Sequence, residues 1–332
     1  MTNRRKKIAR KAGASRHFLL SQTDIRRVEG LPAYGADRAR TALLGAFPDV
    51  GCGPRLRQEA VERLNDCDRF GVIVLRPAAA PAADGAAPDA DTLAPIAERL
   101  EAACRRSGAF WGIEDSGMLA AYWPNREAAE CVELARSLQE EIRTQTGRTV
   151  TAGVAAHPTL DYPRQQALEN ACKAVDHAVF FGPGSRVAFD AVSLNISGDK
   201  FYERGDIASA IREYERALAL DGGNVNVHNS LGVCYGVLGD HEKALEQFSA
   251  ALRLEPGEYM AVYNIGLIHA LLGRRDAALG FFLKANALRD DVFEILAQTI
   301  TRAFEAYERM REVAMITIVE RSLLCLAGVA AV

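Results

Sequence analysis

Residues 225–258 read VNVHNSLGVCYGVLGDHEKALEQFSAALRLEPGE, and their pattern of small and large side chains recurs 34 residues earlier and 34 residues later. The recurring columns are the glycines Gly198, Gly232 and Gly266, the alanines Ala210, Ala244 and Ala278, and the aromatics Tyr214, Phe248 and Phe282. A fixed period of this length is typical of stacked supersecondary units, each too small to bury its own apolar face. The pattern therefore predicts a repeat array over residues 191–290.

This spacing resembles the tetratricopeptide repeat (TPR), a helix–turn–helix unit of about 34 residues. The resemblance implies an all-α solenoid with repeats at 191–224, 225–258 and 259–292, and a role in binding a protein or peptide. Gly205, Gly239 and Gly273 also keep the period, and a glycine there is expected to end the first helix of each repeat.

The first helices of such repeats line a concave groove, and the family's groove positions define a neutral-to-apolar surface here. Asparagine amides can both donate to and accept from the main chain of an extended peptide. Lysine and arginine residues that would clamp a peptide carboxylate are absent from these positions. The expected partner-binding residues are Asn195, Asn229, Val233, Val237, Asn264, Leu267 and Leu271.

Residues 291–332 continue with an amphipathic pattern that predicts further helices. A terminal repeat leaves a bare apolar face, so part of this segment is expected to cap the array. The residues leave two alternatives open for the remainder, which are packing within the chain and pairing with a second copy of it.

Composition bounds the remaining possibilities. The chain has 332 residues, 49% of them hydrophobic, and a net charge of −3, which argues against a dedicated nucleic-acid-binding protein. No run approaches the roughly 18 uncharged apolar residues that a membrane-spanning helix needs. Seven cysteines without metal-site spacing predict reduced thiols and a cytoplasmic location. Residues 1–34 are basic, and we expect a solvated, disordered tail there.

The preceding half of the chain predicts a mixed α and β domain. Residues 35–68 form a helical lead-in, and residues 69–190 alternate between periods of 2 and 3.6. The expected order is β-α-β-β-α-β followed by α-β, which is a ferredoxin-like pattern. An Ala/Pro-rich stretch at 77–91 is expected to be a flexible insertion in this domain.

Four stretches of residues 91–190 resemble a GGDEF domain, the diguanylate cyclase module of the nucleotide-cyclase-like superfamily. They are TLAPIAERL at 92–100, WGIED at 111–115, TVTAGVA at 149–155, and NACKAVDHA at 170–178 with GSRV at 184–187. The resemblance implies a bacterial-type signalling protein whose α+β, nucleotide-cyclase-like domain precedes the TPR solenoid.

The residues that would perform cyclase chemistry are largely missing. Of the signature hairpin only Gly112, Glu114 and Asp115 remain, and the first strand ends at Arg76 with no carboxylate for a divalent metal. We therefore expect a non-catalytic scaffold with no metal or cofactor, in which the degenerate domain is an interface or a weak nucleotide sensor. The alternative is a divergent nucleotidyl cyclase that uses Glu114 and Asp115 for metal.

The histidines add no site to this interpretation. His157, His177, His228, His241 and His269 show no ligand-like spacing and no pairing with cysteine or acid in the sequence. We interpret them as packing or surface residues.

Overall fold

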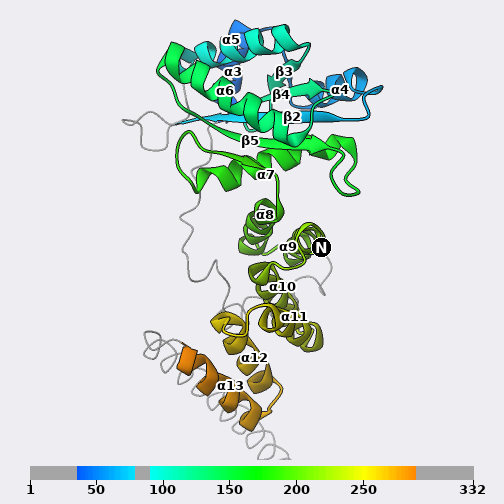
Figure 1. The fold of residues 1–332 in the computed structure, drawn as a ribbon, viewed down its shortest axis with the longest axis vertical. Coiled ribbons are helices and arrows are strands. Elements are labelled where there is room, and N and C mark those ends of the chain that lie inside the picture. The colour runs from blue at the N-terminus through cyan, green and yellow to red at the C-terminus, as the bar shows by residue number, and fades with distance from the viewer. Residues whose placement is uncertain (1–35, 79–89, 289–332) are drawn as a thin grey trace, which may run out of the picture. The chain divides into compact units, whose positions relative to one another are not determined.

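The computed structural model describes residues 36–78 and 90–288 (Figure 1). The predicted basic tail at 1–34, most of the insertion at 77–91 and the predicted cap at 291–332 lie outside the described residues. Within the described ranges, the N-terminal part holds a β-sheet covered by helices and the C-terminal part is helical throughout.

Six strands form one sheet in the order β1-β3-β4-β2-β5-β6. The central strand β2 is antiparallel to both β4 and β5, whereas β1 pairs with β3 and β6 pairs with β5 in parallel. Sequence analysis missed β1, because residues 35–68 were expected only to form a helical lead-in. The strands are β1 (Gly51–Cys52), β2 (Phe70–Pro77), β3 (Phe110–Ile113), β4 (Leu119–Pro124), β5 (Val150–His157) and β6 (Arg186–Ala188).

Helices cover both faces of this sheet (Figure 1). One face carries α3 (Ala36–Ala46), α5 (Ala90–Ser107) and α6 (Ala128–Thr146), and the other carries α4 (Pro54–Arg63) and α7 (Ala167–Val179), which follows the short 3₁₀ helix η1 (Arg164–Gln166). The apolar run in β2 reflects this arrangement, because successive side chains of a strand point to opposite faces. Ile73 and Leu75 enter one core, and Val72 and Val74 enter the other.

Helix α7 lies unusually close to the sheet where it crosses β5. A Cβ atom added at Gly153 would lie 2.2 Å from the carbonyl oxygen of Ala171 and 2.3 Å from the backbone nitrogen of Val175. Only glycine fits such an approach of two backbones. Gly153 therefore sets the position of α7, which in turn contacts the first helix of the C-terminal array.

The C-terminal array consists of helix pairs that start at Ala191, Val225 and Tyr259, as the 34-residue period predicts. The glycines that end the first helix of each pair, Gly205, Gly239 and Gly273, have φ of 79°, 82° and 73°. These left-handed conformations confirm their role as helix terminators. The helices are α8 (Ala191–Glu203), α9 (Ile207–Leu220), α10 (Val225–Leu238), α11 (His241–Leu254), α12 (Tyr259–Leu271) and α13 (Arg275–Leu288).

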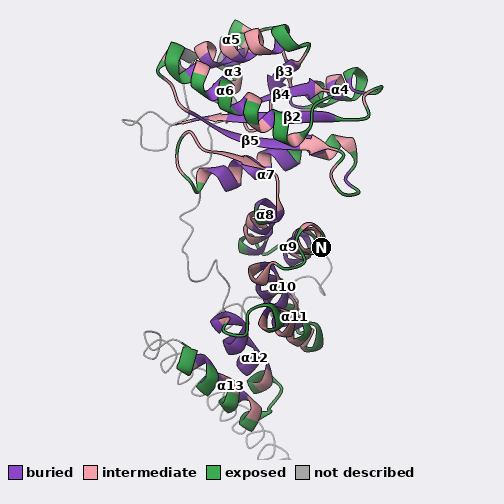
Figure 2. Cartoon of the chain, viewed as in Figure 1, coloured by how far each residue is buried: buried purple, intermediate pink, exposed green. Residues whose placement is uncertain are grey.

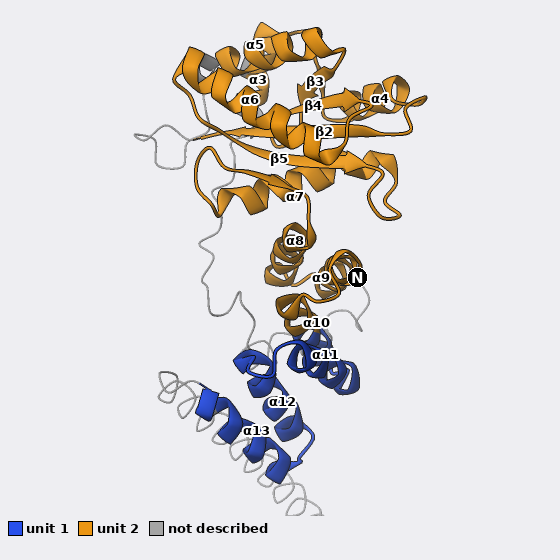
Figure 3. Ribbon diagram, viewed as in Figure 1, with its two compact units in different colours: residues 1–22, 232–332 blue, residues 23–231 orange. Residues whose placement is uncertain are grey.

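Backbone contacts divide the chain into two compact units, and the boundary falls inside α10, between Leu231 and Gly232 (Figure 3). Among the described residues, the sheet and the first helix pair belong to one unit, and residues 232–288 belong to the other. The first repeat is therefore part of the same compact unit as the sheet.

Each helix pair closes around one glycine and one aromatic ring. A Cβ atom at Gly198 would lie 2.4 Å from the ring of Tyr214, and one at Gly232 would lie 2.6 Å from the ring of Phe248. The third pair repeats this contact between Gly266 and Phe282 at 2.9 Å. In each pair the glycine and the aromatic residue therefore contact each other, because the glycine has no side chain and leaves room for the ring.

This contact makes a stability prediction for Gly232. Replacing Gly232 with Ala should lower the free energy of unfolding by about 1–3 kcal/mol, because the buried ring of Phe248 must shift. Gly280→Ala is the matched control, since no heavy atom lies within 4 Å of its added Cβ, and it should stabilise helix α13 by up to about 1 kcal/mol. Urea unfolding of the full chain measures both. Equal effects of the two substitutions would contradict the contact.

Candidate functional site

The predicted groove residues are mostly interior. Leu271 is 54% exposed, but the remaining six are buried: Asn195, Asn229, Val233, Val237, Asn264 and Leu267. Figure 2 colours the chain by burial and shows buried residues in every helix pair of the array. Helix α12 shows why, since residues 259–268 are all buried and the helix is apolar on every side. Partner binding by this groove stays a prediction.

One buried asparagine has a property that bears on binding. The side-chain oxygen Oδ1 of Asn195 on α8 is buried and has no hydrogen-bond partner among the described residues. A buried carbonyl oxygen without a donor costs about 1–3 kcal/mol. A ligand that supplies an N–H group at this point would recover that cost.

The residues of the signature hairpin lie between β3 and β4, and each has a structural partner. Gly112 packs tightly, because an added Cβ would lie 2.5 Å from both the carbonyl oxygen of Gly51 and the side chain of Leu56. Its small size is thus required by the neighbouring strand β1 and helix α4. Gly112 therefore has a packing role.

The two hairpin carboxylates are engaged by other protein groups. Glu114 Oε2 accepts a hydrogen bond of 2.7 Å from the backbone N–H of Ser116 and a second from the Ser116 hydroxyl. Asp115 pairs with the guanidinium of Arg57 on α4, and its hydrogen bond raises the pKa of that arginine. In the described ranges, no three His, Cys, Asp or Glu residues lie close enough together to hold a metal ion. These contacts stabilise the hairpin, and they place the guanidinium of Arg57 beside the Asp115 carboxylate.

A cluster that sequence analysis missed joins the sheet to the first helix pair. Lys173 on α7 is buried, and its Nζ lies 2.9 Å from Oε2 of Glu213 on α9 and 3.1 Å from Oε1 of Glu169. Lys200 on α8 pairs with Asp176 on α7 at 2.5 Å. We call this set of contacts between α7 and the α8–α9 pair the seam. Its members are far apart in the chain, so no local signal in the sequence could have paired them.

Next to the seam, α9 makes a cation–aromatic contact with the loop that precedes η1. Arg216 on α9 pairs with Asp161, and its guanidinium carbon lies 4.5 Å from the centre of the Tyr162 ring. A cation over an aromatic face is stabilising by about 0.5–1 kcal/mol at an exposed site. This contact anchors the loop between β5 and η1 to the first repeat.

His177 has an acidic partner in the folded chain, which the spacing of the histidines in the sequence did not indicate. Its Nδ1 lies 3.2 Å from Oδ1 of Asp190 and 3.3 Å from the hydroxyl of Ser193. Asp190 is the N-cap of α8 and accepts the Ser193 backbone N–H at 2.8 Å. Burial raises the pKa of Asp190, but the hydrogen bonds from His177 and Ser193 outweigh it and leave that pKa lowered.

This His–Asp–Ser group is a helix cap with no nucleophile to offer. Both Asp190 and Ser193 face the same ring nitrogen of His177, whereas a catalytic relay needs the serine and the acid on opposite nitrogens. Ser193 is also fully buried, so a substrate could not reach it. The group holds the start of α8 against α7.

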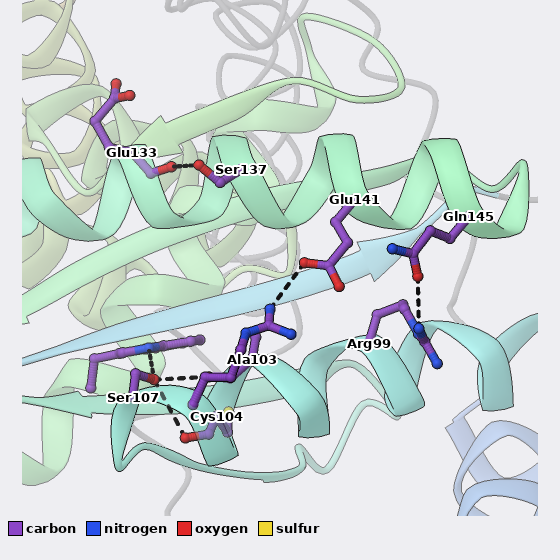
Figure 4. A network of polar contacts seen from close by, with 10 residues as sticks. Arg99, Ala103, Cys104, Ser107, Glu133, Ser137, Glu141 and Gln145 are labelled. Atoms are coloured by element: carbon purple, nitrogen blue, oxygen red, sulfur yellow. Dashed lines mark hydrogen bonds and ion pairs between the residues drawn. The ribbon is translucent and has the colours of Figure 1, made fainter.

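Helices α5 and α6 are connected on their outer side by a further polar network (Figure 4). Arg99 donates to Gln145 at 2.7 Å, and Arg106 donates to Glu141 at 3.0 Å. Arg106 is 60% exposed and Glu141 is 26% exposed, and ion pairs near the surface stabilise proteins by about 0–1 kcal/mol. We interpret this network as structural support for that face of the sheet.

Two family profiles match the helical array. The family profile described as TPR repeat matches residues 198–238, and the profile described as tetratricopeptide repeat matches residues 225–258. With the 34-residue helix pairs, these matches show that the chain contains tetratricopeptide repeats. No curated protein matches the chain.

The solved structures similar to this chain include several TPR domains, and each similarity described below spans about a third of the chain. The second TPR of Spaghetti (RPAP3), bound to the HSP90 peptide SRMEEVD, is 25% identical over 30% of this chain and 93% of its own, with a TM-score of 0.29. MamA is 28% identical over 32% and 61%, with a TM-score of 0.30. The Sgt2 TPR domain from Aspergillus fumigatus is 23% identical over 36% and 82%, with a TM-score of 0.31.

No helix in the described part of the chain is long and apolar enough to span a membrane.

The burial of Lys173 in the seam leads to a prediction about stability. Glu213→Ala should lower the free energy of unfolding by about 3 kcal/mol, because Lys173 loses its nearest partner inside the protein. The double variant Lys173→Met/Glu213→Leu should recover most of that loss, since it removes both charges. Arg136→Ala, which breaks an exposed pair on α6, should leave stability unchanged. If Glu213→Ala behaved like Arg136→Ala in chemical unfolding, the seam would not be a stabilising contact.

Proposed function

We propose that this protein is a non-catalytic scaffold that binds a protein partner through its TPR array. The observation that carries the proposal is the presence of tetratricopeptide repeats, a class of helix pair that serves protein–protein interaction. Extended surfaces built from stacked repeats bind partners along their length. The partner class is an extended peptide or a protein segment.

We propose that the surface that contacts the partner lies within residues 232–288. Leu271 is exposed at the end of α12, and the buried residues Val233, Val237, Asn264 and Leu267 would take part only after a rearrangement that uncovers them. An apolar patch with one or two precisely placed polar groups is typical of a binding site.

The sheet domain has a separate proposal, which is a ferredoxin-like, nucleotide-cyclase-like fold retained as an interface or weak nucleotide sensor. The order β3-β4-β2-β5, with β2 antiparallel to both neighbours, supports the ferredoxin-like part. No disulfide joins the six described cysteines, and we propose a reducing compartment, the cytoplasm, for this protein.

Partner binding can be tested at Leu271, because an exposed residue can be changed without disturbing the core. Affinity capture with the full chain should enrich a protein at least tenfold, and Leu271→Glu should abolish that enrichment by placing a charge in the apolar contact. Leu254→Glu, at a comparably exposed leucine at the end of α11, is the matched control and should retain the partner. Identical capture by both variants would place binding elsewhere.

The enzyme alternative, a divergent nucleotidyl cyclase using Glu114 and Asp115, is tested directly. We expect no cyclic product when the purified chain is incubated with GTP or ATP and Mg²⁺ or Mn²⁺, because Arg57 and Ser116 already bind the two carboxylates. Chromatography coupled to mass spectrometry measures the product. A cyclic nucleotide formed by the wild type and lost in Asp115→Ala would overturn the scaffold proposal for this domain.

A further inference from the structure

The loop that follows α7 in the sheet domain exposes two phenylalanines in succession. Phe180 is 50% exposed and Phe181 is 69% exposed. Pro183 in the same loop is exposed as well, and residues 180–185 carry no charge. Because burying a phenylalanine side chain is strongly favourable, an exposed pair of them indicates a surface that contacts another molecule.

This loop is held in a defined conformation by the elements beneath it. The hydroxyl of Ser185 donates to the carbonyl oxygen of Ala178 and, at 2.7 Å, to that of Gly182. The ring of Phe181 also lies 5.4 Å from the ring of His177 on α7, between centroids. The structure therefore presents the two rings to solvent from a fixed turn.

Helix α6 and the residues after it bring two arginines to the base of the loop. Gln139 on α6 donates to the carbonyl oxygen of Gly184 at 3.1 Å, and Arg143 lies one turn further along the same face of α6. A Cβ atom added at Gly184 would lie 3.1 Å from the side chain of Thr149, which follows Arg148 directly. Both arginines are consequently neighbours of the phenylalanine loop.

A third arginine, Arg186, begins β6 immediately after the loop. None of these three arginines forms an ion pair with a carboxylate in the part of the chain that the structure describes. The acids on the adjoining helices have other partners, since Glu141 on α6 pairs with Arg106 at 3.0 Å and Asp176 on α7 pairs with Lys200. The loop thus combines an apolar tip with a cationic base.

We propose that residues 180–185 insert their two phenylalanines into an anionic phospholipid surface, with the three arginines against the headgroups. An aromatic tip beside cations has the chemistry of an interfacial membrane anchor. Anionic lipids supply phosphate groups to all three arginines at once, whereas a protein pocket for two rings needs no cations beside it. This proposal goes beyond the proposed function and does not depend on it.

Sedimentation with vesicles tests the proposal on the full chain. The wild type should bind vesicles made of equal parts phosphatidylglycerol and phosphatidylcholine, and high salt should weaken that binding by screening the arginines. Phe180→Ser/Phe181→Ser should bind about tenfold more weakly or worse, because two apolar side chains no longer enter the bilayer. Val61→Ser/Leu160→Ser is the matched control and should bind like the wild type, since it changes two exposed apolar residues elsewhere in the same compact unit.

Either of two sedimentation results would overturn the proposal. One is equal binding of the phenylalanine variant and its control to the anionic vesicles. The other is a wild-type chain that ignores the vesicles, and loss of a captured protein in the phenylalanine variant would then assign the loop to a protein partner.

A fluorescence measurement reports on the loop itself. The two native tryptophans, Trp111 and Trp123, are 7% and 3% exposed, so Phe181→Trp adds the single solvent-facing indole of the described residues. On anionic vesicles its emission should shift to shorter wavelength and be quenched by spin-labelled lipids. Leu160→Trp is the control and should show neither change. Vesicle binding without a shift at position 181 would place the contact elsewhere in the chain and contradict the proposal.

Discussion

The helical array depends on one close approach, in which a helix backbone lies against an aromatic ring of its partner. At Gly198, Gly232 and Gly266 a single added carbon would lie within 2.9 Å of a ring. Each helix pair can close only while that carbon is missing. Closure buries the aromatic and alanine columns, whose burial is the main favourable term of folding. Stacking of the pairs, and any surface they present, follows from this contact.

The sheet half follows the same physical rule at a different place. Gly153 lets α7 approach β5 backbone to backbone, and α7 then carries Lys173 and His177 to the first helix pair. Because the seam is polar, it fixes orientation through specific partners, whereas an apolar contact would tolerate sliding. Burying Lys173 beside Glu213 costs desolvation, which the paired charges offset. Among the described residues, the first repeat is consequently part of the sheet unit, and residues 232–288 belong to the other unit.

The chemistry of the sheet domain and the binding surface of the repeats depend on different residues. The hairpin carboxylates stabilise their own turn and the packing of α4, so the sheet domain shows no spare acid at that place. The repeats have the features of an interaction module, while most of their expected groove residues are interior. Binding through the array therefore has to use side chains at the ends of helices, such as Leu271, or a rearrangement that uncovers the asparagines.

The sequence by itself determined the features that depend on neighbours along the chain. The 34-residue period predicted the helix pairs, the glycines predicted where the first helix of each pair ends, and the periods within residues 69–190 predicted a domain of mixed strands and helices. Only the tertiary structure decided the strand β1, the seam around Lys173, the pairing of His177 with Asp190, and the burial of Asn229 and Asn264. Each of these rests on contacts between residues far apart in the chain or on packing from all sides. Periodicity records which face of an element is apolar, but it carries no information on which distant side chain comes to cover that face.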